Sequence, residues 1–431
     1  MPPSIFISAG EASGEHYGAL LASALRTLLP SAEIVGMGGP RMAAAGVKLI
    51  VRAEDMAVMG LTEVVLHLPR IYRELRKLKR AIRAHPPTVA ILIDFPEINF
   101  RLAREFHRLG VPVIYFVSPQ LWAWKQHRIR LVHEYVRRML VIFPFEEPYY
   151  RARGVDAEFV GHPLADLPQP SITREQFAAE DHLDPARTWI GLLPGSRMKE
   201  IEANLPKMLK AATLLSHGQL PRGNPEPQFL IPLAPTLTAA QRAAAQRLVK
   251  DLGSNIDLRL IGDSGAEGTL NPAASAARAV LFHARASIVA SGTATVEAAL
   301  IGNPFVVVYR VSPLTYAIAR RMVKVPHVAM ANLIAQKRVV PEFIQHDFTA
   351  ANIAEQLSPL LPDGPARESM RIELGAVRKA LRGQAAHQQG QTAIERVAAI
   401  VVQEVEAQSA APGYAVTPSG HSETHKNLTT P

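Results

Sequence analysis

Short apolar segments alternate with helical patterns from Ile5 to Val160, and the alternation starts again after a proline-containing break at Asp166–Ser171. This alternation predicts parallel sheets, because two parallel strands must be joined by a crossover, usually a helix. Two such runs predict an α/β protein of two Rossmann-like, doubly wound parallel-sheet domains. Such sheets bind ligands at the carboxyl ends of their strands, which predicts a site in the interdomain cleft. The predicted strands are Ile5–Ser8, Ile34–Gly36, Val89–Ile93, Val113–Val117, Met139–Phe143, Glu158–Val160, Ile190–Leu193, Phe229–Pro232, Ile256–Ile261, Ser287–Ala290 and Phe305–Tyr309.

The same pattern divides the chain. We expect one domain at 1–168, a second at 169–385, a helical segment at 386–408 and a disordered tail rich in Ser, Thr, Pro and Gly at 409–431. Two later segments, Ala331–Ile334 and Val340–Gln345, we interpret as loops. Helices are predicted around Gly18–Leu29, Leu68–Arg83 and Asn99–Arg108.

Composition excludes several classes of protein. Hydrophobic residues make up 48% of the 431 residues and charged residues 20%, which excludes a largely disordered chain. Cysteine is absent, so disulfides, thiolate catalysis and cysteine-ligated zinc are excluded. No apolar run approaches the roughly 18 residues of a membrane span, and the N-terminus lacks the features of a signal peptide. We therefore expect a cytoplasmic protein. The histidines show no metal-binding spacing, so no metal or cofactor is expected.

The positive charge is concentrated in one predicted helix. The formal net charge is +9, and Leu68–Arg83 holds seven of the cations and only one acid, Glu74. Apolar residues at helical spacing predict that one face packs on the sheet. The charged face is either the solvated side of an ordinary crossover helix or a contact with an anionic surface. Its density favours the anionic surface, and the lack of a recognition module disfavours nucleic acid.

Two motifs follow strands of the first half. Gly10, Gly14 and Gly18 form a G-x3-G-x3-G turn, which is neither a dinucleotide motif nor a P-loop. It is either an anion or substrate site or a tight strand-to-helix turn with solvated acids. Asp94 directly follows the apolar strand Val89–Ile93, where partial desolvation would keep a carboxylate basic enough to accept a proton. The alternative is that Asp94 caps the next helix.

Two further motifs follow strands of the second half. Gly195-Ser196-Arg197 combines close backbone approach, a hydroxyl donor and a guanidinium fork for phosphate. Ser291-Gly292-Thr293 begins a helix, whose N-terminus favours an anion. Glu297 lies one turn further on and is placed to accept from a sugar diol. Either motif alone could be a helix cap, but together they favour a phosphate-bearing ligand.

These motifs, taken together, resemble the lipid-A-disaccharide synthase family from about residue 4 to 400. The resemblance implies a GT-B glycosyltransferase that joins UDP-2,3-diacylglucosamine to 2,3-diacylglucosamine 1-phosphate (lipid X) and releases UDP. The product is the β-1,6 disaccharide of lipid A, a part of Gram-negative lipopolysaccharide. The resemblance also implies a homodimer that exchanges C-terminal segments. The matching blocks are Ala9–Gly18, Met59–Val64, Ser118–Trp124, Gly161–Pro163, Pro194–Arg197, Ser291–Glu297 and Ala331–Ile334.

The motifs and the family resemblance together predict roles for individual residues. A single displacement that inverts the anomeric carbon needs one general base. Asp94 is the first candidate, with Glu11, Glu15 and His16 as competitors. We place UDP on the second domain and the acceptor on the first, beside Ser13, Trp122 and Trp124. The UDP-binding candidates are Gly195, Ser196, Arg197, Ser291, Gly292, Thr293, Glu297 and Asn332.

Both substrates carry acyl chains, so we expect peripheral attachment to the cytoplasmic face of the inner membrane. Two other functions remain open at this point. A UDP-sugar 2-epimerase would share the UDP half of the site without needing a lipid surface. A non-enzymatic protein would use only the basic helix to bind an anionic surface. The residues expected at the membrane are Arg73, Arg76, Lys77 and Arg80.

Overall fold

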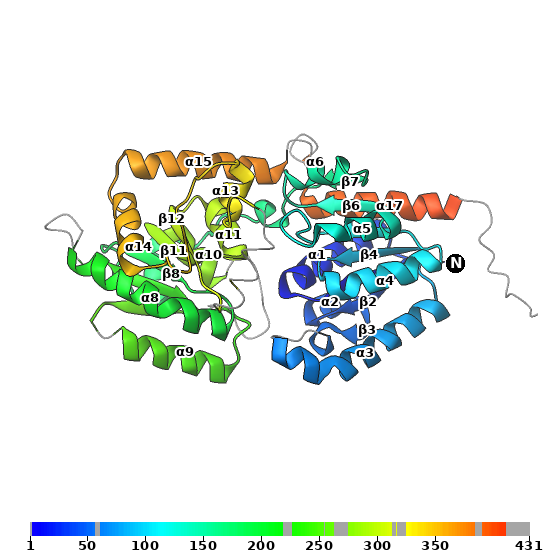
Figure 1. Cartoon of the computed structure of the whole chain (residues 1–431), viewed down its shortest axis with the longest axis horizontal. Helices are drawn as coiled ribbons and strands as arrows, with labels where there is room; N and C mark the ends of the chain where they lie inside the picture. The colour runs from blue at the N-terminus through cyan, green and yellow to red at the C-terminus, as the bar shows by residue number, and fades with distance from the viewer. Residues whose placement is uncertain are drawn as a thin grey trace, which may run out of the picture.

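Two parallel sheets, each flanked by helices, form two domains that lie side by side (Figure 1). The computed structural model describes residues 2–56, 61–218, 226–253, 255–262, 275–312, 316, 325–383 and 390–410. The predicted fold class is therefore confirmed. Met59 and Gly60 of one family block lie outside the described residues, as does the predicted tail from 411 onward.

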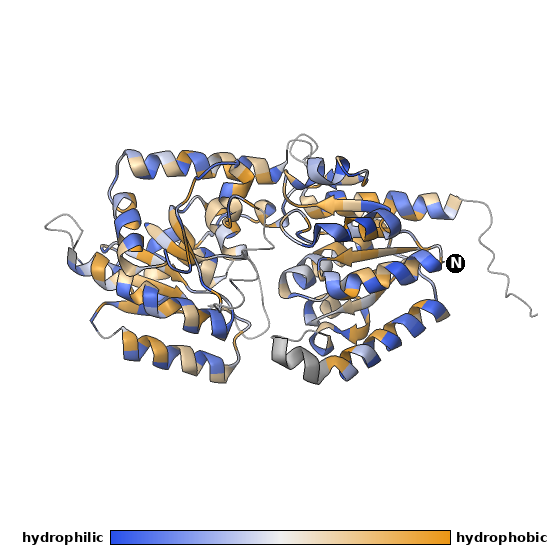
Figure 2. Ribbon diagram, in the orientation of Figure 1, coloured by the Kyte–Doolittle hydropathy of each residue, from blue (hydrophilic) through white to orange (hydrophobic). Residues whose placement is uncertain are grey.

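The first sheet has seven strands in the order β3-β2-β1-β4-β5-β6-β7. Its central strand β4 is apolar throughout and fully buried, as expected for a strand covered on both faces; Figure 2 shows the strands of both sheets as predominantly hydrophobic. The strands are β1 Ser4–Ala9, β2 Glu33–Gly38, β3 Lys48–Arg52, β4 Val89–Ile93, β5 Val113–Phe116, β6 Arg138–Val141 and β7 Ala157–Phe159. The helices are α1 Ala12–Leu28, α2 Pro40–Ala44, α3 Leu61–Ala84, α4 Pro96–Arg108, α5 Ile129–Tyr135 and α6 Glu146–Arg151.

The second sheet has six strands in the order β10-β9-β8-β11-β12-β13. Its strands are β8 Trp189–Leu193, β9 Gln228–Pro232, β10 Leu258–Ile261, β11 Ala286–Ala290, β12 Phe305–Tyr309 and β13 Glu342–Ile344. Its helices are α7 Arg174–Glu180, α8 Met198–Gly218, α9 Ala239–Leu252, α10 Ala276–His283, α11 Thr293–Ile301, α13 Met330–Ala335, α14 Ala350–Leu357 and α15 Pro365–Arg382.

The strand order reverses between β1 and β4 in the first sheet and between β8 and β11 in the second. Doubly wound sheets bind ligands outside the carboxyl ends of the strands at this switch point. The segments that follow these four strands are the four motifs selected from the sequence. The topology therefore gathers all four at the two switch points.

Four local predictions were wrong. The segments interpreted as loops are helix α13 and edge strand β13, and strand β3 was missed. Both missed strands are short and carry charged residues at or next to their ends, which weakens the apolar signal. Helix α1 begins at Ala12 rather than near Gly18, so Ser13, Glu15 and His16 belong to its first turns.

The last helix, α17 Ala393–Ala410, returns to the first domain and packs beside α1 (Figure 1). Its N-terminal backbone N–H at Ala393 donates to Asp166 Oδ2 at 2.8 Å, and Arg396 pairs with Glu158 at 2.8 Å. The helix extends two residues into the segment predicted to be disordered. The exchange of this helix between two chains stays a prediction.

Candidate active site

The turn that carries Asp94 is built from two strained residues. Asp94 and Phe95 have φ angles of 46° and 48°, a left-handed conformation that non-glycine residues rarely adopt. The buried Asn99 amide donates to the carbonyls of Ile93 at 3.1 Å and Asp94 at 2.6 Å. The Tyr115 hydroxyl donates to the same Asp94 carbonyl at 2.7 Å. These buried bonds hold the turn in its unfavourable geometry.

Asp94 does not cap α4. The N-cap residue is Phe95, and it makes no side-chain capping hydrogen bond. The capping alternative is therefore wrong. Gly10 after β1 packs directly on this turn, because a Cβ at Gly10 would come within 2.2 Å of the Phe95 ring. Only glycine permits this close approach, which brings the β1–α1 motif against the β4–α4 turn.

The environment of Asp94 makes it a base near neutral pH. Burial and, to a smaller extent, the Glu11 and Glu97 carboxylates together raise its pKa to about 7, while the Phe95 N–H opposes the shift. A general base works best when its pKa lies near the operating pH. The exposed Glu11 lies close enough to act on Asp94 electrostatically, so these two candidates lie together.

The other two candidate bases have different surroundings. Glu15 Oε1 accepts the Arg41 backbone N–H at 2.8 Å and so holds the N-terminus of α2. His16 is partly buried, and this burial together with Arg41 lowers its pKa to about 4. His16 is therefore neutral at pH 7 and keeps a lone pair that can accept a proton.

The loop after β5 is fastened by α6. Glu146 is buried, and its Oε1 accepts the Ser118 hydroxyl at 2.6 Å and the Trp122 indole N–H at 3.0 Å. Tyr149 and Tyr150 donate to backbone carbonyls of the same loop at 3.0 and 2.9 Å. Burial raises the pKa of Glu146 to about 7, against the effect of its hydrogen bonds.

Trp122 and Trp124 therefore differ. Trp122 is 9% exposed and bonded to Glu146, so it supports the loop from within. Trp124 is 37% exposed, and Lys125 Nζ lies 3.9 Å from the centre of its ring. Of the two, only Trp124 has a surface open to solvent that could contact a ligand or a membrane.

The first loop of the second domain is an anion cradle that a carboxylate fills. Gly195 has a φ of 127°, and the Ser196 N–H donates to Glu200 Oε2 at 3.0 Å. The Arg197 N–H donates to the same oxygen at 3.4 Å, and Arg197 Nη1 lies 3.5 Å from Glu200 Oε1. The Arg197 side chain is 57% exposed. These donors already favour negative charge, as a diphosphate site requires.

The second loop begins α11. Gly292 is its N-cap, with a φ of 145° and no side-chain cap, and Gly292 and Thr293 are exposed. Burial raises the pKa of Glu297, one turn later, to about 7, while Arg278 opposes the shift. Exposed backbone N–H groups at this N-terminus, followed by an acid, suit a phosphate and a ribose diol respectively.

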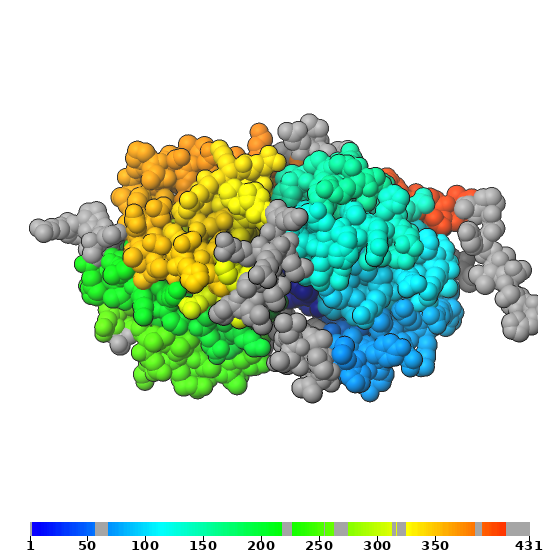
Figure 3. All heavy atoms as spheres, viewed as in Figure 1, coloured from blue at the N-terminus to red at the C-terminus, as the bar shows by residue number. Residues whose placement is uncertain are grey.

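The two halves of the site face the same cleft. Burial raises the pKa of Tyr17 on α1, and both Glu297 of the second domain and Asp94 of the first raise it further. Tyr17 therefore lies within electrostatic range of both acids. Figure 3 shows the hollow between the domains, where dark-blue atoms from the start of the chain are visible. Among the described residues, no cluster of three His, Asp or Glu side chains could hold a metal ion.

A family model described as lipid-A-disaccharide synthetase matches residues 5–396 of this chain. The chain belongs to the lipid-A-disaccharide synthase family. The synthase of Acidobacterium capsulatum is 61% identical over 379 residues, covering 88% of this chain and 92% of the relative. That of Koribacter versatilis is 48% identical and covers 88% and 93%. The predicted family and enzymatic class, a glycosyltransferase, are thereby confirmed.

Solved structures with low sequence identity share the fold. The kitacinnamycin glycotransferase is 15% identical with a TM-score of 0.57 and covers 94% of this chain and 99% of its own. The S. aureus MnaA–UDP co-structure is 13% identical with a TM-score of 0.60 and covers 94% and 97%. A UDP-GlcNAc 2-epimerase from Neisseria meningitidis scores 0.54 at 14% identity and covers 94% and 99%. Because glycosyltransferases and epimerases share this GT-B architecture, the fold alone does not separate the two activities.

Within this synthase fold, Asn332 is fully engaged by the protein. It is completely buried; its Oδ1 accepts the N–H groups of Val339 and Val340 at 2.7 and 2.9 Å. Its Nδ2 donates to the Val340 carbonyl at 2.9 Å and to Glu342 at 2.7 Å. Asn332 thus joins α13 to β13, and its predicted contact with the nucleotide stays a prediction.

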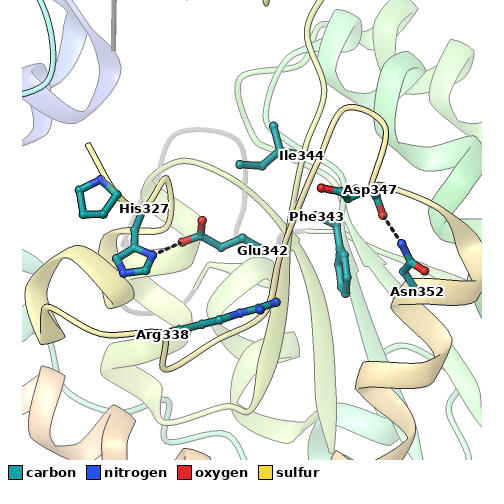
Figure 4. Close-up of a pocket in the computed structure, with 8 residues that line it drawn as sticks. His327, Arg338, Glu342, Phe343, Ile344, Asp347 and Asn352 are labelled. Carbon is teal, nitrogen blue, oxygen red and sulfur yellow. Dashed lines mark hydrogen bonds and ion pairs between the residues drawn. The ribbon is translucent and has the colours of Figure 1, made fainter. Parts of the chain in front are cut away.

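Glu342 sits at the wall of a cavity of about 440 Å³ beside edge strand β13 (Figure 4). It also accepts the Ala329 N–H at 3.0 Å at the start of α13 and lies 3.9 Å from His327 Nδ1. The acid interpreted as part of a loop therefore organises α13. The cavity is lined by Pro326, His327, Arg338, Glu342, Phe343, Ile344, Asp347 and Asn352.

The sequence analysis missed Glu146, although a usable signal was present. Glu146 follows the buried strand β6 within the segment Phe143–Glu146, as Asp94 follows β4. A search for acids after buried strands that extended to the start of the next helix would have selected Glu146 as well. The two carboxylates differ in accessibility: Glu146 is 1% exposed, whereas Asp94 is only partly buried. Glu146 therefore organises the loop, and Asp94 remains the accessible candidate for the base.

Proposed function

We propose that this chain transfers the sugar of UDP-2,3-diacylglucosamine to the 6-hydroxyl of 2,3-diacylglucosamine 1-phosphate and releases UDP. The observation that carries the proposal is Asp94, a partly buried acid with a pKa of about 7 at the switch point of the first domain. Tyr17 links it electrostatically to Glu297 across the cleft. Family membership supplies the identity of the two substrates.

The proposed chemistry is a single displacement. Asp94 accepts the proton of the acceptor 6-hydroxyl as its oxygen attacks the anomeric carbon, which inverts that centre. The departing diphosphate gains negative charge, which Arg197 and the N-terminus of α11 stabilise. Glu297 accepts hydrogen bonds from the ribose. The four residue groups come from both domains, so the reaction needs both sides of the cleft.

We also propose that α3 attaches the first domain to the cytoplasmic face of the inner membrane. Leu68 and Tyr72 are 51% and 55% exposed and lie four residues apart, on one side of the helix. Arg76 lies 4.5 Å from the Tyr72 ring centre. Each cation near an anionic membrane contributes about 1 kcal/mol. The proposed patch is completed by the exposed Arg73, Lys77 and Arg80.

Not all of the charge on α3 is available for this contact. Arg70 pairs with Asp55, and Lys79 and Arg83 both pair with the buried Glu105, at 3.2 and 2.7 Å. These pairs fasten α3 to its own domain. Trp122 is buried and does not contribute to an interface. None of the described helices is long and apolar enough to cross a bilayer.

Homodimerisation, with exchange of the C-terminal segment, is the assembly that we propose from the family resemblance. The segment concerned is α17, which packs on α1 of its own chain here. Light scattering of the purified full chain should give twice the mass of one chain. A monomer at micromolar concentration would contradict this part of the proposal.

The decisive experiment is to incubate the full chain with both acyl sugars in neutral detergent micelles. Release of UDP together with a β-1,6 disaccharide is the expected result. Product that forms only when both sugars are present supports the synthase. Interconversion of UDP-GlcNAc with its 2-epimer, without disaccharide, would instead establish the epimerase and overturn the proposal.

A further inference from the structure

Two cations lie on the rim of the first domain beside the turn that carries Asp94. Lys125 Nζ and Arg128 Nη1 lie 3.7 and 3.5 Å from the same oxygen, Oε1 of Glu97. Lys125 also lies over the Trp124 ring. Glu97 belongs to α4, Arg128 to the 3-10 turn Gln126–Arg128 that follows the β5 loop, and Lys125 is the N-cap of that turn.

The side chains of the two cations are less exposed than that of the acid between them. The side chains of Lys125 and Arg128 are 24% and 25% exposed, whereas that of Glu97 is 55% exposed. An exposed ion pair contributes only about 0–1 kcal/mol, so the Glu97 carboxylate is readily replaced by a stronger anion. Two packed cations with one weakly held counter-ion have the character of an anion site.

This cluster lies next to the proposed base. Glu97 is three residues after Asp94, in the first turn of α4, and its charge contributes to the raised pKa of Asp94. The N-terminus of α4 has no side-chain cap, so its dipole also favours negative charge here.

The acceptor carries an anion where such a site is needed. Its 1-phosphate is attached to C1, and its 6-hydroxyl is on C6, which is attached to C5. C1 and C5 flank the ring oxygen, so the phosphate and the hydroxyl lie at the same edge of one sugar ring. If the hydroxyl is at Asp94, the phosphate is one sugar ring away or less. We propose that Lys125 and Arg128 bind the 1-phosphate of the acceptor, a sugar phosphomonoester, and that the phosphate displaces Glu97. The inference rests on the proposed synthase function and deepens it.

The test compares two acceptors that differ only in the phosphate: 2,3-diacylglucosamine 1-phosphate and 2,3-diacylglucosamine. Reactions are run in neutral detergent micelles, so that no anionic surface contributes. The wild-type chain should prefer the phosphorylated acceptor in kcat/KM. The double variant Lys125→Gln/Arg128→Gln should lose about 30-fold or more for this acceptor, because charge-assisted bonds to phosphate are lost. Its kcat/KM for the unphosphorylated acceptor and its UDP affinity should be unchanged.

Two single variants complete the design. Glu97→Gln should lower the KM for the phosphorylated acceptor several-fold, because the competing carboxylate is removed. Arg130→Gln is the matched control: it removes an exposed cation two residues beyond Arg128 and should change neither acceptor's kinetics. UDP affinity measured by calorimetry shows that each variant is folded.

Three outcomes would overturn the inference. An equal loss with both acceptors would assign the cations to the support of the loop. Wild-type kinetics that do not distinguish the acceptors would exclude a phosphate subsite while leaving the synthase function in place. A double variant that keeps its acceptor preference but no longer binds phosphatidylglycerol vesicles would assign the cations to a lipid headgroup. Failure of the wild-type chain to use either acceptor would refute the proposed function itself.

Discussion

Replacement of Asp94 by Asn should abolish transfer and at the same time stabilise the protein. Asn is isosteric with Asp and tolerates the left-handed φ of 46° at this position, so the turn should not be disturbed. A general base contributes roughly 10²–10⁴-fold to the rate. We therefore expect kcat to fall at least about 100-fold, with UDP affinity near that of the wild type.

The gain in stability follows from the same burial that makes Asp94 a base. Its pKa rises from 3.8 to about 7 on folding, so the ionised form is disfavoured in the folded state. The penalty is absent below pH 3.8, grows between pH 3.8 and 7, and is complete above pH 7. A difference of about three pKa units corresponds to an upper limit of about 4 kcal/mol at pH 8. Asn removes this penalty, because it is never charged.

Urea unfolding of wild type and Asp94→Asn at pH 5 and pH 8 measures this effect. The variant should be the more stable protein at pH 8, and its advantage should shrink at pH 5. Activity of the wild type, measured with saturating donor so that Glu297 is not limiting, should fall as the pH drops through about 7. A variant that is both active and no more stable than wild type would refute the account of Asp94 as a desolvated base.

Further outcomes are expected at three other places in the structure. Arg197→Ala and Glu297→Ala should each weaken UDP binding, because they remove a phosphate contact and a ribose acceptor; calorimetry that shows unchanged affinity in both would contradict the donor site. Activity should survive EDTA, because Arg197 and the α11 N-terminus supply the positive charge; strict dependence on Mg²⁺ would refute this. Glu146→Ala should lower the free energy of unfolding by about 2–4 kcal/mol, because the Ser118 hydroxyl and Trp122 N–H lose a buried partner; a smaller change in urea unfolding would contradict the conclusion that Glu146 holds the loop after β5. Loss of four α3 cations should release the protein from anionic vesicles with UDP binding intact. The matched loss of four second-domain cations should not release it. If the α3 variant and this control sediment equally with the vesicles, the membrane contact lies elsewhere. The α3 variant changes Arg73, Arg76, Lys77 and Arg80 to Gln, and the control changes Arg247, Lys250, Arg371 and Lys379 to Gln.

The sequence alone determined the architecture, and it selected the candidate site residues that follow the strands. Strands buried on both faces must be apolar throughout, so segments such as Val89–Ile93 are visible without a structure. Parallel sheets place ligands after the strands, which directed attention to Asp94, Gly195–Arg197 and Ser291–Thr293. The short, charge-flanked strands β3 and β13 lacked this signal and were missed.

Only the tertiary structure decided which polar side chains are available for chemistry. In the sequence, Glu15 and Asp94 are both acids in segments that follow strands. In the structure, Glu15 accepts a hydrogen bond from the backbone N–H of Arg41, 26 residues away, whereas burial raises the pKa of Asp94. The Trp122 indole N–H donates to Glu146, 24 residues away, so Trp122 supports its loop from within. Local sequence patterns record burial and helix or strand periodicity, because these depend on neighbouring residues. Hydrogen-bond partners are chosen by the packing of distant segments, so the function of a polar residue is settled only when the chain has folded.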